Sequence, residues 1–142
     1  MSNYHVFKGT YKGLEKIKLA DGSIHELSEV VAYSENDDIF VFKVEGNSYT
    51  SIPISKRKVR VGEKAYAIGS PRGLENTFSS GEISQLRDGF IQISVPIDHG
   101  SSGGVLLNSY GEAIGITTAG YDNSGANLNF AVDIHVLEKY IH

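Results

Sequence analysis

The chain has 142 residues, of which 40% are hydrophobic, and its formal net charge is −4. This length is enough for one compact domain or for two small packed β-barrels, while the acidic balance argues against nucleic acid as a partner, because proteins attracted to phosphate backbones are basic. The absence of cysteine excludes disulfides, thiolate metal sites and a cysteine nucleophile, so covalent catalysis would require oxygen or nitrogen.

The first half of the chain is expected to form antiparallel strands joined by polar turns. Apolar and charged residues alternate from Leu14 to Leu19, and Asp21-Gly22 is typical of a two-residue hairpin turn that leads to a return strand between Ile24 and Tyr33. The β-branched and aromatic run from Ile39 to Val44 indicates a buried strand. A further strand is expected from Tyr49 to Ile54.

A cationic run, Lys56-Arg57-Lys58-Val59-Arg60, follows that strand. It can be interpreted as a solvated connector between two sheets or as a nucleic-acid patch. Only four cations cluster there, so we prefer the connector.

The second half is more regular, with short strands separated by glycine, asparagine, aspartate and serine. Six strands are expected, at Lys64–Ile68, Thr77–Leu86, Phe90–Val95, Val105–Leu107, Ala113–Thr118 and Leu128–Val132. Asn108-Ser109-Tyr110-Gly111 is typical of a hairpin turn, and in the strand from Phe90 the residues Ile91 and Ile93 share one face. The tail from Asp133 to Ile141 has apolar residues at helical spacing behind an N-cap aspartate, which predicts one short terminal helix.

The most specific chemistry lies in Gly100-Ser101-Ser102-Gly103-Gly104. Flanking glycines allow a sharp turn in which consecutive N–H groups point the same way, and such a nest stabilises an oxyanion. Ser102 is the candidate nucleophile because it directly precedes the glycine pair and an apolar strand. The backbone of Gly100, Ser101 and Ser102 is the candidate oxyanion hole. By itself, the loop is interpreted equally well as a hairpin tip with two turn-forming serines, so the case depends on its partners.

A serine nucleophile needs a base within hydrogen-bond reach, and the base needs a group that fixes its tautomer. The chain has five histidines. Four lie at the chain end, in the expected terminal helix, in a hairpin strand or too close to the serine on the same turn: His142, His135, His25 and His99. His5 remains, in a short apolar-flanked segment of the other half of the chain.

Several segments, in register, resemble the HtrA-type trypsin-like serine proteases. Asn3-Tyr4-His5-Val6 is similar to the histidine motif of that family, the segment from Asp38 to Val44 is similar to its aspartate strand, and Gly100-Ser101-Ser102-Gly103-Gly104 matches its serine motif in four of five places. Further segments with matching patterns are Ala67-Ile68-Gly69-Ser70-Pro71-Arg72-Gly73-Leu74, Ser80-Gly81-Glu82-Ile83-Ser84, Gly115-Ile116-Thr117-Thr118-Ala119 and Asn129-Phe130-Ala131-Val132. The order His, Asp, Ser is also the order of that superfamily.

The resemblance implies an all-β fold, a trypsin-like double β-barrel with a short C-terminal helix. Residues 1–58 would form a partial N-terminal barrel and residues 59–142 the C-terminal barrel. In the family, two strands precede the histidine, whereas only four residues precede His5, so the first barrel is expected to be incomplete and the chain to be truncated at its N-terminus.

The resemblance also implies roles for individual residues. His5 would take the proton from Ser102 during attack on a peptide carbonyl, while Asp38, which directly precedes the apolar strand, would orient the imidazole. The primary specificity pocket would be lined by Ile97, Thr117 and Leu128, without a carboxylate at its base, which favours cleavage after small or medium aliphatic residues. The segment formed by Thr117, Thr118 and Ala119 would pair with an extended substrate.

The predicted function is therefore serine endopeptidase activity on peptide or unfolded protein substrates. The alternatives are a weakly active or inactive protease-like domain that acts as a peptide-binding module and, less favoured, a structural β-barrel. No cofactor is expected, and no metal site, because the histidines are not paired at ligand spacing. No membrane partner is expected either, since no stretch approaches the roughly 18 apolar residues of a membrane helix.

Overall fold

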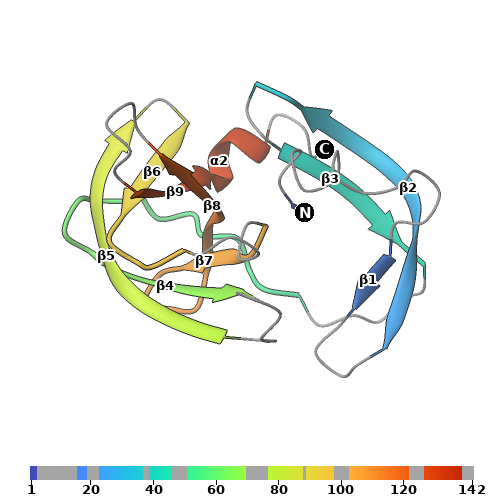
Figure 1. The fold of residues 1–142 in the computed structure, drawn as a ribbon, viewed down its shortest axis with the longest axis horizontal. Coiled ribbons are helices and arrows are strands. Elements are labelled where there is room, and N and C mark those ends of the chain that lie inside the picture. Colours follow the sequence, from blue (N-terminus) through green and yellow to red (C-terminus); the bar gives the residue numbers. More distant parts are fainter. Residues whose placement is uncertain are drawn as a thin grey trace.

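A computed structural model describes residues 1–2, 16–18, 23–36, 39–45, 51–69, 77–87, 89–97, 103–121 and 127–138. Over these residues the chain is mostly strand, with one short helix near the C-terminus (Figure 1). The elements are β1 (Lys16–Lys18), β2 (Ile24–Ser34), β3 (Ile39–Val44), β4 (Lys64–Gly69), β5 (Thr77–Arg87), β6 (Phe90–Ile93), β7 (Val105–Leu107), β8 (Ala113–Tyr121), β9 (Asn127–Asp133) and α2 (Ile134–Leu137).

The first three strands form an antiparallel sheet in the order β1-β2-β3. The hairpin of β2 and β3 pairs Ser34 with Ile39 next to its turn, and its register shifts twice further along. Ile39, Phe40 and Val41 are buried, as expected for a β-branched and aromatic strand. The predicted strand from Ile39 to Val44 is therefore confirmed.

The remaining strands close into an antiparallel barrel in the order β4-β5-β6-β9-β8-β7. Side chains alternate along β6, where Ile91 and Ile93 are buried in the barrel and Phe90 and Gln92 are half-buried on the other face. Each fully buried isoleucine of this kind contributes about 1.5–3 kcal/mol through removal of apolar surface from water. The prediction of an all-β chain is confirmed, as is that of a terminal helix, which Asp133 caps by accepting a hydrogen bond from the backbone N–H of His135.

The expected strand from Tyr49 to Ile54 is wrong over the residues that the structure describes, since 51–54 contain no strand. Ile54 forms only an isolated parallel bridge with Ala113. Pro53 explains this difference, because proline has no N–H to donate to a ladder and contributes only its carbonyl, which accepts from the N–H of Ala113 at 2.8 Å.

The three-stranded sheet packs against the barrel through an apolar cluster that is separate from the core of the barrel. Ile39 and Val41 of β3 meet Ile116 of β8, Val132 of β9 and Ile134 of α2 in this cluster. In Figure 1 the helix lies between the two sheets, beside β3. The cluster fixes the start of β3 against one face of the barrel. No helix in the described part of the chain is long and apolar enough to cross a membrane.

Candidate active site

The segment that carries the predicted base is tied to the strand that follows the predicted carboxylate. The N–H of Ser2 donates to the carbonyl of Phe40 at 2.9 Å, and the N–H of Phe40 donates to the carbonyl of Ser2 at 2.8 Å. This antiparallel bridge lies three residues before His5 and two residues after Asp38. Two parts of the chain that are distant in sequence therefore run side by side at this point.

The segment after the predicted nucleophile is anchored to β8. The N–H of Gly103 donates to the carbonyl of Thr117, and the N–H of Thr117 donates to the carbonyl of Gly104, both at 2.9 Å. Gly103 has a φ of 92°, a left-handed conformation that favours glycine and allows the chain to turn sharply before β7. The backbone at Gly103 and Gly104 is thus fixed against β8, just before β7 begins.

Each of these two anchors has a chain neighbour in the apolar cluster between the sheet and the barrel. Ile39, which is 1% exposed, comes directly after Asp38, and Ile116, which is 7% exposed, comes directly before Thr117. Both belong to the same cluster. The strand that follows the predicted carboxylate and the strand that anchors Gly103 and Gly104 therefore pack against each other.

The predicted triad of His5, Asp38 and Ser102 lies outside the described residues, as do Gly100 and Ser101 of the predicted oxyanion hole. Their positions therefore stay predictions.

Of the predicted substrate-binding residues, the structure places two in well-packed surroundings. Ile97 is buried in the barrel core cluster. Thr117 is 1% exposed, and its hydroxyl donates to the carbonyl of Gly104 at 3.2 Å. This bond adds a side-chain brace to the backbone bonds that hold the loop. Whether either residue also contacts substrate stays a prediction.

The other three predicted substrate-binding residues lie at neighbouring positions of β8 and β9. Thr118 pairs with Phe130, Ala119 pairs with Asn129, and Leu128 pairs with Gly120 in the ladder between these strands. On its other side, β8 pairs with β7 only from Ala113 to Ile116 among the described residues. Whether an extended peptide adds to the backbone of Thr118 and Ala119 on this side stays a prediction.

Two further histidines have local partners. The Oγ of Ser23 lies 2.8 Å from Nε2 of His25, two residues along the same strand segment. His135 Nδ1 lies 3.0 Å from Oδ1 of Asp133, the residue that caps α2. Each ring thus interacts with a near neighbour in the sequence. In the described part of the chain, no group of three or more acidic or histidine side chains is arranged to hold a metal ion.

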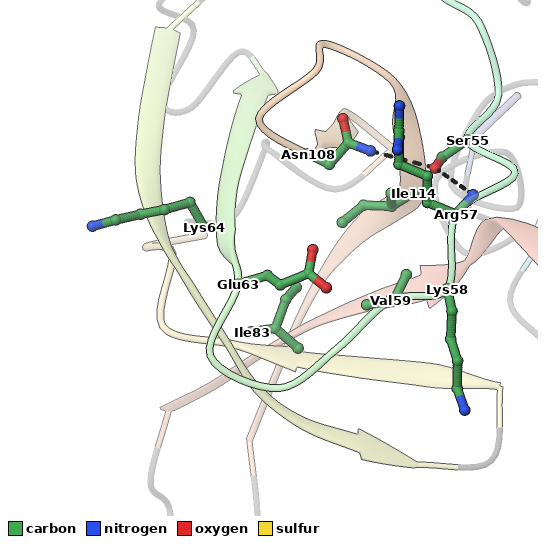
Figure 2. A pocket seen from close by; sticks show the side chains of 9 residues that line it. All are labelled: Ser55, Arg57, Lys58, Val59, Glu63, Lys64, Ile83, Asn108 and Ile114. Atoms are coloured by element: carbon green, nitrogen blue, oxygen red, sulfur yellow. Dashed lines mark hydrogen bonds between the residues drawn. The ribbon is translucent and has the colours of Figure 1, made fainter.

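A partly buried polar network that sequence reasoning missed lies at the turn of the β7–β8 hairpin. Glu112 Oε1 accepts from Asn108 Nδ2 at 2.9 Å, from Arg57 Nε at 3.2 Å and from Ser55 Oγ at 3.3 Å. Asn108 Nδ2 also reaches Ser55 Oγ at 3.3 Å. Figure 2 shows Ser55 and Asn108 pointing toward one another across a small pocket between the connector and the barrel. We call the set of Ser55, Arg57, Asn108 and Glu112 the Glu112 network.

Electrostatics favour the charged form of Glu112. The hydrogen bond from Asn108 has the largest effect and lowers the pKa of the Glu112 carboxyl, while burial, the next-largest effect, raises it. The charge and hydrogen bond of Arg57 and the hydroxyl of Ser55 lower the pKa further, so the net direction is downward. Arg57 in turn stacks on Tyr110, with its guanidinium carbon 3.9 Å from the ring centroid. The sequence contained one clue to this network, the hairpin turn at 108–111, but the contacts join residues more than fifty positions apart.

Over the described residues, a closed antiparallel barrel packs against a second antiparallel sheet, the arrangement expected for the trypsin-like class of fold. A family model described as "Trypsin-like peptidase domain" matches residues 1–116. The chain belongs to this family.

Similar proteins have names that describe proteases. Protease Do-like 1, chloroplastic, of Arabidopsis thaliana is 34% identical over 96% of this chain and 34% of that protein. A probable periplasmic serine endoprotease DegP-like of Halomonas elongata is 37% identical over 96% of this chain and 30% of that protein. The serine endoprotease from Yersinia pestis has a similar structure, with a TM-score of 0.82 and 31% identity over 97% of this chain and 50% of that one. The chain therefore spans about a third of the length of these two sequence relatives.

Proposed function

We propose that the protein is a serine endopeptidase that cleaves peptide bonds with Ser102 as nucleophile, His5 as general base and Asp38 as the orienting carboxylate. The observation that carries the proposal is the packing of β3 against β8. Ile39, next to the bridge between Ser2 and Phe40, and Ile116, next to the anchor of Gly103 on Thr117, belong to one apolar cluster. Membership of the trypsin-like peptidase family supports the same conclusion.

The N-terminal bridge supports the proximity of the base to the two neighbouring aspartates. Continuing the antiparallel pairing of Ser2 with Phe40 would bring Tyr4 opposite Asp38 and His5 opposite Asp37, so His5 would lie close to both aspartates. Neighbouring strands lie about 4.8 Å apart, which is within the reach of an imidazole and a carboxylate. The choice of Asp38 over Asp37 rests on the resemblance, in which the aspartate directly precedes the apolar strand.

The proposed chemistry is acyl transfer in two stages. The Oγ of Ser102 would attack the peptide carbonyl carbon while His5 accepts its proton, and the resulting oxyanion would be stabilised by the N–H groups of Gly100 and Ser102. His5 would then give the proton to the leaving amine, and water would hydrolyse the acyl-enzyme by the same sequence of proton transfers. Asp38 would hold the imidazole in the required tautomer throughout.

The proposed substrate is an extended peptide or an unfolded protein. Such a chain could add as a strand to the edge of β8 at Thr118 and Ala119, where the described residues of β7 provide no partner. Ile97, Thr117 and Leu128 carry no charge, so a pocket lined by them would suit a small or medium aliphatic side chain. The cleft would lie between the parts formed by residues 1–58 and residues 59–142.

A fluorophosphonate probe tests the proposal, because it reacts with an activated serine and leaves ordinary hydroxyls unmodified. We expect the probe to label Ser102 in the wild-type chain, and we expect labelling to fall at least about 10³-fold in Ser102→Ala. Ser23→Ala is the matched control, since Ser23 also lies within hydrogen-bond distance of a histidine, and it should label at the wild-type rate. A chain that binds peptide but is not labelled would be a binding module and would refute the proposal.

A further inference from the structure

The connector between the sheet and the barrel docks on the β7–β8 hairpin. The N–H of Ser55 donates to the carbonyl of Ala113 at 3.0 Å, and the N–H of Ala113 donates to the carbonyl of Pro53 at 2.8 Å. Ser55 is fully buried although it is polar. The connector is thus held against the barrel at a fixed point by its backbone, and the Glu112 network adds side-chain bonds at the same point.

The Glu112 network joins two segments of the chain, and each of them leads to one half of the proposed active site. The β7–β8 hairpin has its turn at residues 108–112, and its other end holds Gly103 and Gly104 against Thr117. The connector leads back along the chain to β3, which begins directly after Asp38. Glu112 therefore contacts the one covalent link between the sheet and the barrel and lies on the hairpin that ends at the nucleophile loop.

We propose that Glu112 is a positioning residue, which fixes the connector to the hairpin and thereby holds the base and the carboxylate in register with the nucleophile. This inference rests on the proposed serine endopeptidase function. Glu112 accepts from three donors of two segments at one oxygen atom, so its removal would abolish three side-chain hydrogen bonds at once. The backbone bond from Ser55 to Ala113 and the stacking of Arg57 on Tyr110 would remain, but the connector would be held less tightly. Displacements of about 1 Å between reacting groups can lower rates about 100-fold.

The hairpin itself should survive this removal. Its turn is closed independently by Asn108 Oδ1, which accepts from the N–H groups of Tyr110 and Glu112 at 2.9 and 3.0 Å. Backbone bonds between Asn108 and Glu112 and between Gly111 and Asn108 add to this closure. Loss of the carboxylate should therefore loosen the connector without unfolding the barrel.

The test measures the second-order rate of fluorophosphonate labelling per folded molecule, in buffer well below the unfolding transition. We expect the rate to fall about 10-fold or more in Glu112→Ala. In Glu112→Gln it should recover to within about threefold of wild type, because the amide oxygen can still accept from Asn108 and Arg57. Glu82→Ala, which removes an exposed ion pair with Lys64 on the same barrel, is the matched control and should label at the wild-type rate.

The outcomes separate the two proposals. If the wild type is labelled and Glu112→Ala is labelled equally fast per folded molecule, Glu112 has no positioning role, while the serine endopeptidase function stands. If Glu112→Gln reacts as slowly as Glu112→Ala, the hydrogen-bond geometry is not what matters and the inference is also overturned. If the wild type is not labelled at all, the proposed function fails and the positioning role fails with it.

Discussion

Replacement of Asp38 by Asn is expected to lower kcat for peptide hydrolysis by about 10⁴-fold while the chain remains folded. An asparagine at this position would keep the shape of the side chain but would favour the wrong tautomer of His5, and it could not stabilise the imidazolium formed during attack. The measurement is the steady-state hydrolysis of an unfolded protein substrate at neutral pH, together with circular dichroism to establish folding.

The adjacent aspartate provides the matched control. Asp37→Asn makes the same chemical change one position earlier in the sequence and should leave kcat within about threefold of wild type, because Asp37 has no role in the proposed mechanism. Equal losses in the two variants would contradict the assignment of Asp38, and a loss confined to Asp37→Asn would reverse it.

Replacement of Gly81 by Ala is expected to lower the free energy of unfolding by about 3 kcal/mol. A β-carbon at this position of β5 would lie 2.7 Å from both the Oγ of Ser94 and the backbone nitrogen of Val95. The backbone atom cannot move aside by a simple rotation, and the Ser94 hydroxyl is already used, since it accepts from the N–H of Glu82 at 2.9 Å. Urea denaturation followed by circular dichroism measures the change.

Gly62 separates this crowding from a conformational effect. It has a φ of 91°, and a β-carbon there would meet no atom within 4 Å, so Gly62→Ala should cost only about 1 kcal/mol from backbone strain. If Gly81→Ala proves no more destabilising than Gly62→Ala, Gly81 packs less closely against Ser94 and Val95 than the structure shows.

Much of the fold could be predicted because local pattern and tertiary environment agree. The alternation of Ile91 and Ile93 with half-buried neighbours and the cap provided by Asp133 are both visible in a few consecutive residues. The strand expected at Tyr49–Ile54 failed in its described part, because a β-rich composition says nothing about whether a partner strand lies within reach of Pro53.

The candidate site likewise contains some features that the sequence predicts and others that it does not. The motif around Gly103 can be predicted from the sequence because a glycine at a sharp turn is a local requirement, and the structure shows the positive φ at Gly103 that favours glycine there. The Glu112 network could not be foreseen, since Ser55 and Glu112 are 57 positions apart and nothing in either local sequence indicates the other. The brace from Thr117 to Gly104 is also a contact of the tertiary fold rather than of a motif.

The measurement that tests the central claim most directly is a crystal structure of the wild-type chain with a phosphonate bound covalently to Ser102. The account predicts that a ring nitrogen of His5 lies about 3 Å from the serine oxygen or from the leaving-group position, and that the other ring nitrogen lies about 3 Å from a carboxylate oxygen of Asp38. A phosphonate on another serine, or an imidazole of His5 beyond hydrogen-bond reach of both groups, would contradict it.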